Sequence, residues 1–258
     1  NDWDTSEVTD MSEMFYRAEN FNQPIGDWDV SNVTDMSNMF YRAENFNQPI
    51  GDWDVSNVTT MRAMFTEALS FNQNINNWDV SNVKDMAQMF SSWGSLDFNQ
   101  PLNNWDVSNV KDMSEMFYSA DFNQAIDNWD VSNVTDMSHM FYVASFNQAI
   151  GNWDVSNVTD MSHMFSKALS FNQNINNWDV SNVTDMSHMF SEALSFNQPL
   201  DNWDVSNVTN MSGMFYRTKS FNQPLDNWNV SNVTNMDNMF KEADSFNQDI
   251  SKLETNLH

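Results

Sequence analysis

Apolar and polar positions repeat along this chain with a period of about 25 residues. Every copy of the repeat keeps one tryptophan, a Phe-Asn-Gln triplet, a valine, two methionines and a second phenylalanine. The repeat predicts one elongated domain over residues 1–250, followed by a C-terminal tail or partial cap at 251–258. The ten tryptophans that mark the period, 24 to 27 residues apart, are Trp3, Trp28, Trp53, Trp78, Trp105, Trp129, Trp153, Trp178, Trp203 and Trp228.

The apolar spacing changes within each copy. Phe21 and Ile25 belong to an alternating pattern that is typical of a strand, whereas Val33, Met36 and Phe40 recur at steps of three and four, as on one face of a helix. Each copy is therefore predicted to hold a short strand and a short helix. The fold class predicted is an α/β repeat solenoid of about ten coils, and a three-sided β-solenoid without helices is the alternative.

A single copy is too small to bury its own aromatic and aliphatic side chains. Equivalent residues of successive copies are expected to pack on one another, and each large apolar side chain then contributes about 1.5–3 kcal/mol before entropy is counted. The methionines are interpreted as core filler rather than as a metal-binding stripe. Only the outer columns of side chains remain free to bind a partner.

The string W-D-V-S-N-V-T-D-M-S-x-M-F occurs with small changes in every copy. It resembles the repeats of BspA-type leucine-rich-repeat surface proteins of bacteria, whose signature is D-T-S-N-V-T-D-M-S-x-M-F. The resemblance implies a leucine-rich-repeat-like solenoid on a cell surface or outside the cell, engaged in adhesion and without catalysis. The segment F-N-Q-x-[I/L] departs from the L-x-x-L-x-L strand of that family.

Charge and composition narrow the classes of partner. The chain has 36 acidic and 10 basic residues, a formal net charge of -26, and no cysteine. This charge repels phosphate backbones and anionic headgroups, so neither nucleic acid nor direct membrane insertion is expected. No phosphate-binding loop or nucleophile motif interrupts the repeats, which predicts a non-enzymatic protein without a required cofactor. The first residues fall inside a repeat, which suggests a fragment of a longer chain.

Two columns of side chains contain candidate metal ligands. Nine copies have Asp directly after Trp, and stacked carboxylates suggest calcium, although the lack of a glycine-bearing calcium loop favours a local Asx turn. One column holds histidine in three successive copies, yet Glu, Asn or Gly elsewhere, which favours an exposed face over a metal site. The candidates are Asp29, Asp54, Asp79, His139, His163 and His188.

The most variable column follows the second phenylalanine. It contains all five tyrosines, and arginine follows three of them; both residue types are enriched at protein-binding hot spots, and an aromatic ring can also stack on a sugar. The one longer copy adds Trp93 at this edge, either as a ligand contact or as a local plug. The candidate binding residues are Tyr16, Arg17, Tyr41, Arg42, Trp93, Tyr118, Tyr142, Tyr216 and Arg217.

These observations predict an extracellular or cell-surface module that binds a protein or a glycan on another surface. Adhesion to a protein is the leading hypothesis. A glycan-binding surface and a spacer made rigid by calcium are the alternatives.

Overall fold

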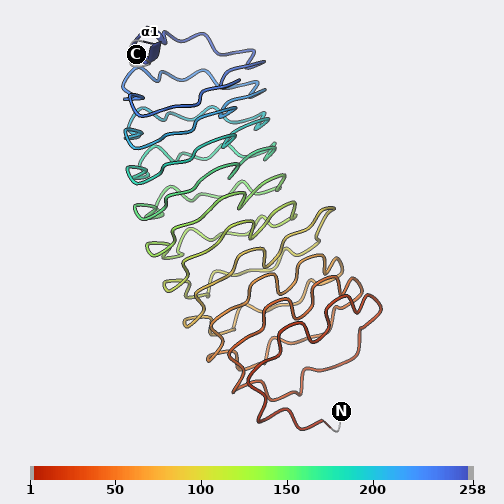
Figure 1. Ribbon diagram of the computed structural model, residues 1–258. Coiled ribbons are helices and arrows are strands. Elements are labelled where there is room, and N and C mark those ends of the chain that lie inside the picture. Colours follow the sequence, from red (N-terminus) through yellow and green to blue (C-terminus); the bar gives the residue numbers. More distant parts are fainter. Residues whose placement is uncertain (1–2, 255–258) are drawn as a thin grey trace.

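The computed structural model describes residues 3–254 and shows a stack of coils, one for each copy of the repeat (Figure 1). Within this range the only helix is α1, Ser251–Glu254, and no strand forms. Successive coils meet through isolated parallel β-bridges, which follow one column from Asp10↔Asp35 to Asn210↔Asn235 except for one bridge elsewhere, Leu96↔Ala120. The predicted α/β solenoid is therefore wrong, and so is the three-sided β-solenoid, because the coils contain neither the expected helices nor strands.

The segment predicted as a helix is a chain of overlapping β-turns. The Met39 N–H donates to the Met36 carbonyl at 3.3 Å, and the Ala43 N–H donates to the Phe40 carbonyl at 2.9 Å. Between these turns, the Phe40 N–H donates to the Met64 carbonyl of the next coil at 2.9 Å. A helix would direct each amide to its own i−4 carbonyl and leave none for the neighbouring coil. The turns bury the same apolar side chains and also tie the coils together.

Most coils have a left-handed backbone at two positions, four residues apart. In the second coil these are Asn38 and Arg42, with φ of 55° and 56°. Each is the third residue of a turn, where a type II geometry requires a positive φ. The conformation costs a non-glycine residue about 1–2 kcal/mol, and the hydrogen bonds that these amides donate to the next coil offset it. The turns repeat every four residues, and a helix repeats every 3.6 residues. Because these periods are so close, the spacing of apolar residues did not distinguish a chain of turns from a helix.

Ladders of aromatic rings run through the core. Trp53 and Trp78 stack with centroids 6.4 Å apart and planes 3° apart, and Phe40 and Phe65 stack at 5.5 Å. The Trp53 indole N–H donates to the carbonyl of Ile25 in the preceding coil at 3.2 Å, and the later repeat tryptophans through Trp228 make the same bond. Like residues therefore contact like residues from coil to coil. The indole N–H groups from Trp53 to Trp228 have acceptors, whereas the buried indole nitrogen of Trp28 has no hydrogen-bond partner within the described residues.

The segment predicted as a strand is joined between coils by side-chain amides. The Asn47 N–H donates to Oδ1 of Asn22 at 3.0 Å, and Nε2 of Gln48 donates to the Asn22 carbonyl at 3.2 Å. Nearby, the rings of Phe21 and Phe46 stack at 5.8 Å. In this segment the side-chain amides of asparagine and glutamine make the hydrogen bonds between coils that a backbone ladder would make in a sheet.

The short helix α1 lies on the last coil and buries Leu253 against the core. It occupies the start of the predicted tail; residues 255–258, with 1–2, lie outside the described range. No helix in the described part of the chain is both long and apolar enough to cross a membrane.

Candidate functional site

The positions equivalent to Tyr41 and Arg42 in the ten coils form one edge of the stack, here called the variable edge. Phe40 is fully buried, and the turn that follows it brings Tyr41 and Arg42 to the partly exposed surface. The left-handed backbone at Arg42 recurs at this position in all coils except the fourth, which carries the insertion. The side chains of the variable edge are therefore displayed on a nearly constant backbone.

Five candidate residues from three coils form one group, here called the aromatic–arginine cluster. Tyr16 and Tyr41 stack with centroids 4.8 Å apart, and Trp93 meets Tyr41 edge-to-face at 6.4 Å. The Arg17 guanidinium carbon lies 5.6 Å from the Tyr16 ring, and that of Arg42 lies 5.9 Å from the Trp93 ring. Trp93 is 65% exposed, so this cluster presents a large aromatic surface to solvent.

The insertion in the longer copy brings Trp93 into this cluster. Trp93 belongs to the fourth coil, yet it reaches back across the third coil to Tyr41 in the second. The Glu67 carboxylate in the third coil accepts the Trp93 backbone N–H and holds the bulge over that coil. Leu96, three residues further on, is fully buried in the core. The insertion thus supplies an exposed aromatic contact at Trp93 and a plug at Leu96.

The other candidate residues of the variable edge lie in two further groups. Tyr118 and Tyr142 stack at 4.6 Å, and the Lys167 ammonium lies 6.0 Å from the Tyr142 ring. Near the C-terminal end, the Arg217 guanidinium lies 4.9 Å from the Tyr216 ring. The structure therefore does not join all the tyrosines into one site.

Charge compensation differs along the edge. Lys167 pairs with Glu192 at 3.9 Å, and Nε of Arg217 pairs with Glu242 at 2.7 Å, in each case one coil further along. Arg17 is instead followed in its column by Arg42, and within the described residues neither forms an ion pair. Nε of Arg42 is buried without a hydrogen-bond partner. In the column of Arg42, the aromatic–arginine cluster thus contains the two cations that form no ion pair within the described residues, whereas Lys167 and Arg217 are paired.

The order of charges in the column of Arg42 is visible in the sequence, but the sequence-based predictions did not use it. Glu67 and Leu96 were also not among the candidate residues predicted from the sequence. Aligning the copies shows opposite signs one repeat apart at Lys167 and Glu192, and like signs at Arg17 and Arg42. The interaction of Glu67 with the bulge has no such sequence signal, because it depends on how the insertion folds.

A comparison with protein-family models places the chain among known sequences. One model, described as Mycoplasma protein of unknown function, DUF285, matches residues 1–97, 92–196 and 170–257. The chain belongs to this family. A comparison with curated proteins finds no match. The family description assigns no activity, so the function of this DUF285 member must be argued from its surface.

The histidine column of this DUF285 protein forms a stack. The His139 and His163 rings have centroids 4.4 Å apart, and His163 and His188 are 4.7 Å apart. Burial, reinforced by the two neighbouring histidines, lowers the pKa of His163 to about 4. Gly213 leaves room for the last ring, since a Cβ there would lie 2.3 Å from Cε1 of His188. Among residues 3–254, no three His, Asp or Glu side chains form a group suited to a metal ion.

The aspartates that follow tryptophan lie in local turns. Oδ1 of Asp29 accepts the Ser31 N–H at 3.0 Å and the Ser31 hydroxyl at 2.6 Å, and these bonds lower the pKa of the Asp29 carboxyl. Asp54 makes the same two bonds with its own serine. Asp79 does likewise. The three candidate calcium ligands therefore each stabilise a corner of their own coil.

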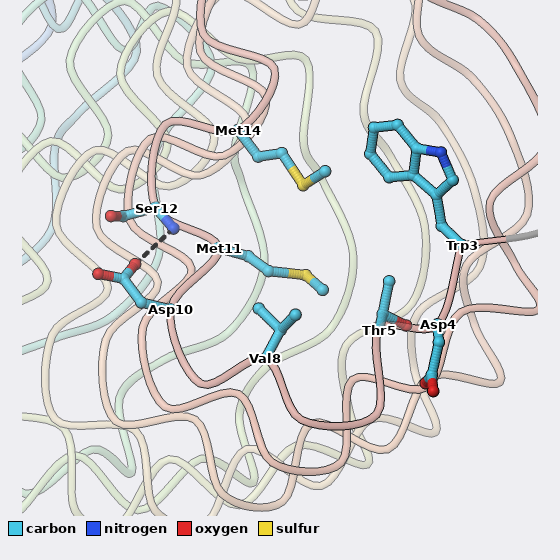
Figure 2. A pocket seen from close by; sticks show the side chains of 8 residues that line it. All are labelled: Trp3, Asp4, Thr5, Val8, Asp10, Met11, Ser12 and Met14. Atoms are coloured by element: carbon cyan, nitrogen blue, oxygen red, sulfur yellow. Dashed lines mark hydrogen bonds between the residues drawn. The ribbon is translucent and has the colours of Figure 1, made fainter.

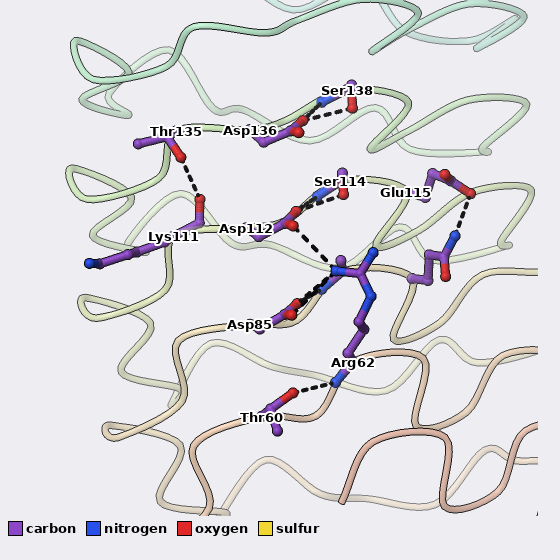
Figure 3. Close-up of polar contacts among 12 residues, drawn as sticks. Thr60, Arg62, Asp85, Lys111, Asp112, Ser114, Glu115, Thr135, Asp136 and Ser138 are labelled. Carbon is purple, nitrogen blue, oxygen red and sulfur yellow. Dashed lines mark hydrogen bonds and ion pairs between the residues drawn. The ribbon is translucent and has the colours of Figure 1, made fainter. Parts of the chain in front are cut away.

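A second column of aspartates contains the β-bridge residues and is partly neutralised by one arginine. Nη1 of Arg62 lies 3.3 Å from Asp85 and 3.3 Å from Asp112, and Figure 3 shows it reaching from a coil in which Thr60 replaces the aspartate. Asp112 also accepts the Ser114 hydroxyl at 2.6 Å. The arginine reduces repulsion between neighbouring carboxylates, which is a structural role.

A pocket of about 460 Å³ lies at the N-terminal end of the stack (Figure 2). Trp3, Val8, Met11 and Met14 supply its apolar wall, and Figure 2 shows their side chains around an open space. In the interior coils the equivalent methionines are buried under the adjoining coil. Asp4, Thr5, Asp10 and Ser12 complete the lining, and Oδ1 of Asp10 accepts the Ser12 N–H at 2.8 Å. The pocket therefore exposes, in the first described coil, the apolar columns that form the core further along.

Proposed function

We propose that this chain is an extracellular or cell-surface module that binds a protein through the aromatic–arginine cluster. The observation that carries the proposal is the joining of exposed Trp93 with two tyrosines and two arginines from other coils. Trp, Tyr and Arg dominate protein-binding hot spots. The resemblance of the repeat string to BspA-type surface proteins supports the location and an adhesive role.

The arrangement of the rings favours a protein over a glycan. A sugar stacks on a free ring face, but Tyr16 and Tyr41 stack on each other, and Arg17 lies over Tyr16. The tyrosines thus offer mainly edges and hydroxyl groups to a partner. These groups suit the mixed apolar and hydrogen-bonding contacts of a protein interface.

The test compares capture of proteins from a cell-surface extract by three immobilised forms of the chain. Trp93→Ala removes the most exposed aromatic ring of the cluster, whereas Tyr216→Ala removes a tyrosine of the same column outside it. We expect proteins captured by the wild type to be lost with Trp93→Ala and retained with Tyr216→Ala. Equal capture by all three forms, or binding on a glycan array that depends on Trp93, would refute the proposal.

A further inference from the structure

We propose that the partner of the aromatic–arginine cluster presents a carboxylate-bearing segment, in which acidic side chains pair with Arg17 and Arg42 while an apolar side chain packs on Trp93. This inference rests on the proposed function and specifies the chemistry of the partner. The observations that support this inference are where the cationic side chains of the variable edge lie and which of them form ion pairs.

Cationic side chains are scarce in this part of the molecule. Arg17 and Arg42 are the only basic residues among residues 1–61, in a chain whose net charge is -26. They occupy the same column in successive coils, and the tyrosines preceding them stack at 4.8 Å. The only two cations of the first coils are thus adjacent, and both lie beside the exposed aromatic rings.

Equivalent cations elsewhere already have partners within the chain. Arg217, like Arg42, directly follows a tyrosine. Nε of Arg217 forms an ion pair with the Glu242 carboxylate at 2.7 Å. The carboxylate nearest in register to Arg42 is Glu67, and it accepts the backbone N–H of Trp93 instead. The fold therefore satisfies the arginine near the C-terminal end and leaves the N-terminal pair available to an external anion.

The hydrogen bonding of Arg42 also supports a site for an external anion. Its Nε is buried and has no hydrogen-bond partner, although the rest of its guanidinium lies near the Trp93 ring. A buried donor without an acceptor is costly, and a carboxylate accepts hydrogen bonds from a guanidinium in a strong, charge-assisted geometry. Because the Arg42 side chain as a whole is partly exposed, an incoming carboxylate can neutralise its guanidinium, and it would accept the Nε donor only after the side chains that cover this atom move aside.

An extended segment of a partner matches the layout of the cluster. Every second side chain of such a segment lies on one face, about 6.5–7 Å apart. Two acidic side chains on that face can meet the arginines of neighbouring coils, while an apolar side chain two residues further along, on the same face, contacts Trp93. The negative charge of the whole chain does not prevent this, because screening at physiological salt limits exposed charges to a range of about 8 Å. Within residues 1–61, where Arg17 and Arg42 are the only basic residues, the acidic surroundings disfavour anions except beside these two arginines.

The experiment uses two short fluorescent peptides at physiological salt. One contains several glutamates around a tyrosine, and the other has glutamine at each glutamate. We expect the glutamate peptide to bind the whole chain and to bind the double variant Arg17→Gln, Arg42→Gln at least about tenfold more weakly. The matched control Arg217→Gln should bind like the wild type, because Arg217 already has a partner. The glutamine peptide should bind weakly to every form.

Several outcomes would overturn the inference. Failure of the glutamate peptide to bind, or equal binding to the double variant, would show that the arginines do not recognise carboxylates. The proposed function would survive if a protein captured from the extract were still lost with Trp93→Ala but not with Arg17→Gln, Arg42→Gln. Binding of an acidic polysaccharide in place of the peptide would refute both. Thermal unfolding of each variant verifies that the stack is intact.

Discussion

The two ends of the variable edge share a backbone and differ in what their arginines contact. Arg42 and Arg217 both follow a tyrosine, and their φ angles are 56° and 55°. Arg217 is held by Glu242, whereas Arg42 lies against Trp93 and has no ion pair within the described residues. A glutamate stands one coil further along in both cases, so the state of each arginine is decided by the insertion, whose Trp93 backbone N–H bonds Glu67, and not by the local conformation of the arginine.

The comparison shows how a repeat scaffold separates stability from recognition. Each coil contacts mainly its neighbours, so a change at one end of the edge leaves the other end unaltered. The aromatic ladders and turn hydrogen bonds are the same at both ends. Differences in binding between the two ends can then be attributed to their exposed side chains.

The largest expected effect concerns the core that both ends share. Phe117, fully buried between the two ends, stacks on Phe90 and on Phe141 at 5.7 Å. We expect Phe117→Ala to lower the free energy of unfolding by about 3–5 kcal/mol. Urea denaturation measures it, with Leu169→Ala, an exposed apolar position, as the control that should change little. A loss below about 1 kcal/mol would mean that the aromatic ladder does not hold the two ends together.

A smaller effect is expected from pH at the histidine stack between the two ends. The pKa of His163 is about 4 in the folded state and about 6.5 in the unfolded state. Burial is the main cause of the lower value, the neighbouring His139 and His188 add to it, and the Asp185 carboxylate opposes it. The unfolded state therefore binds more protons in this window, so stability is lost as the pH falls from 6.5 towards 4. We expect a loss of about 1–2 kcal/mol after allowing for the partial exposure of the ring.

The substitution His163→Asn isolates this contribution. Asn38 shows that asparagine is compatible with the left-handed conformation of this column. The melting temperature of the variant should fall less than that of the wild type between neutral pH and the pKa of His163. Aspartates such as Asp29, whose pKa is lowered from 3.8, lose their contribution only at lower pH, so the windows are separate. Parallel curves for the two proteins would contradict the assignment.

Arg42→Glu converts the N-terminal end into the pattern of the C-terminal end. The new carboxylate would meet Arg17 as Glu242 meets Arg217, and it would repel an acidic partner. We expect binding of the glutamate peptide to weaken at least about tenfold, or about 1.4 kcal/mol, with little change in melting temperature. Glu242→Gln is the reverse experiment: it frees Arg217 but adds no Trp93, so any gain in binding should be smaller. Undiminished binding by Arg42→Glu would break the comparison.

The smallest expected effect concerns the left-handed backbone itself. Between the two ends, the position equivalent to Arg42 holds Val143, which is exposed and has φ of 57°. A β-branched residue is strained there, whereas asparagine tolerates the conformation. We expect Val143→Asn to raise the free energy of unfolding by about 0.5–1 kcal/mol, and Val143→Thr, which remains β-branched, to give no such gain. Calorimetry distinguishes the two.

Part of the site was predictable because the repeats align themselves. The column containing Tyr16, Tyr41 and their arginines was visible as the variable position next to an invariant phenylalanine. The sequence did not indicate that Trp93 would cross a whole coil to reach Tyr41, since this depends on the path of the insertion. It also did not reveal that the histidines would stack ring on ring.

The sequence by itself determined the length of the repeat, the residues that recur in every copy, and the acidic character of the chain. These follow from composition and periodicity, which need no coordinates. Only the tertiary structure decided between helix and turn, because both bury residues spaced three and four apart and differ only in where their amides donate. It likewise decided which arginines are paired, since Arg42 and Glu67 are neighbours in register, yet the carboxylate bonds the Trp93 amide instead.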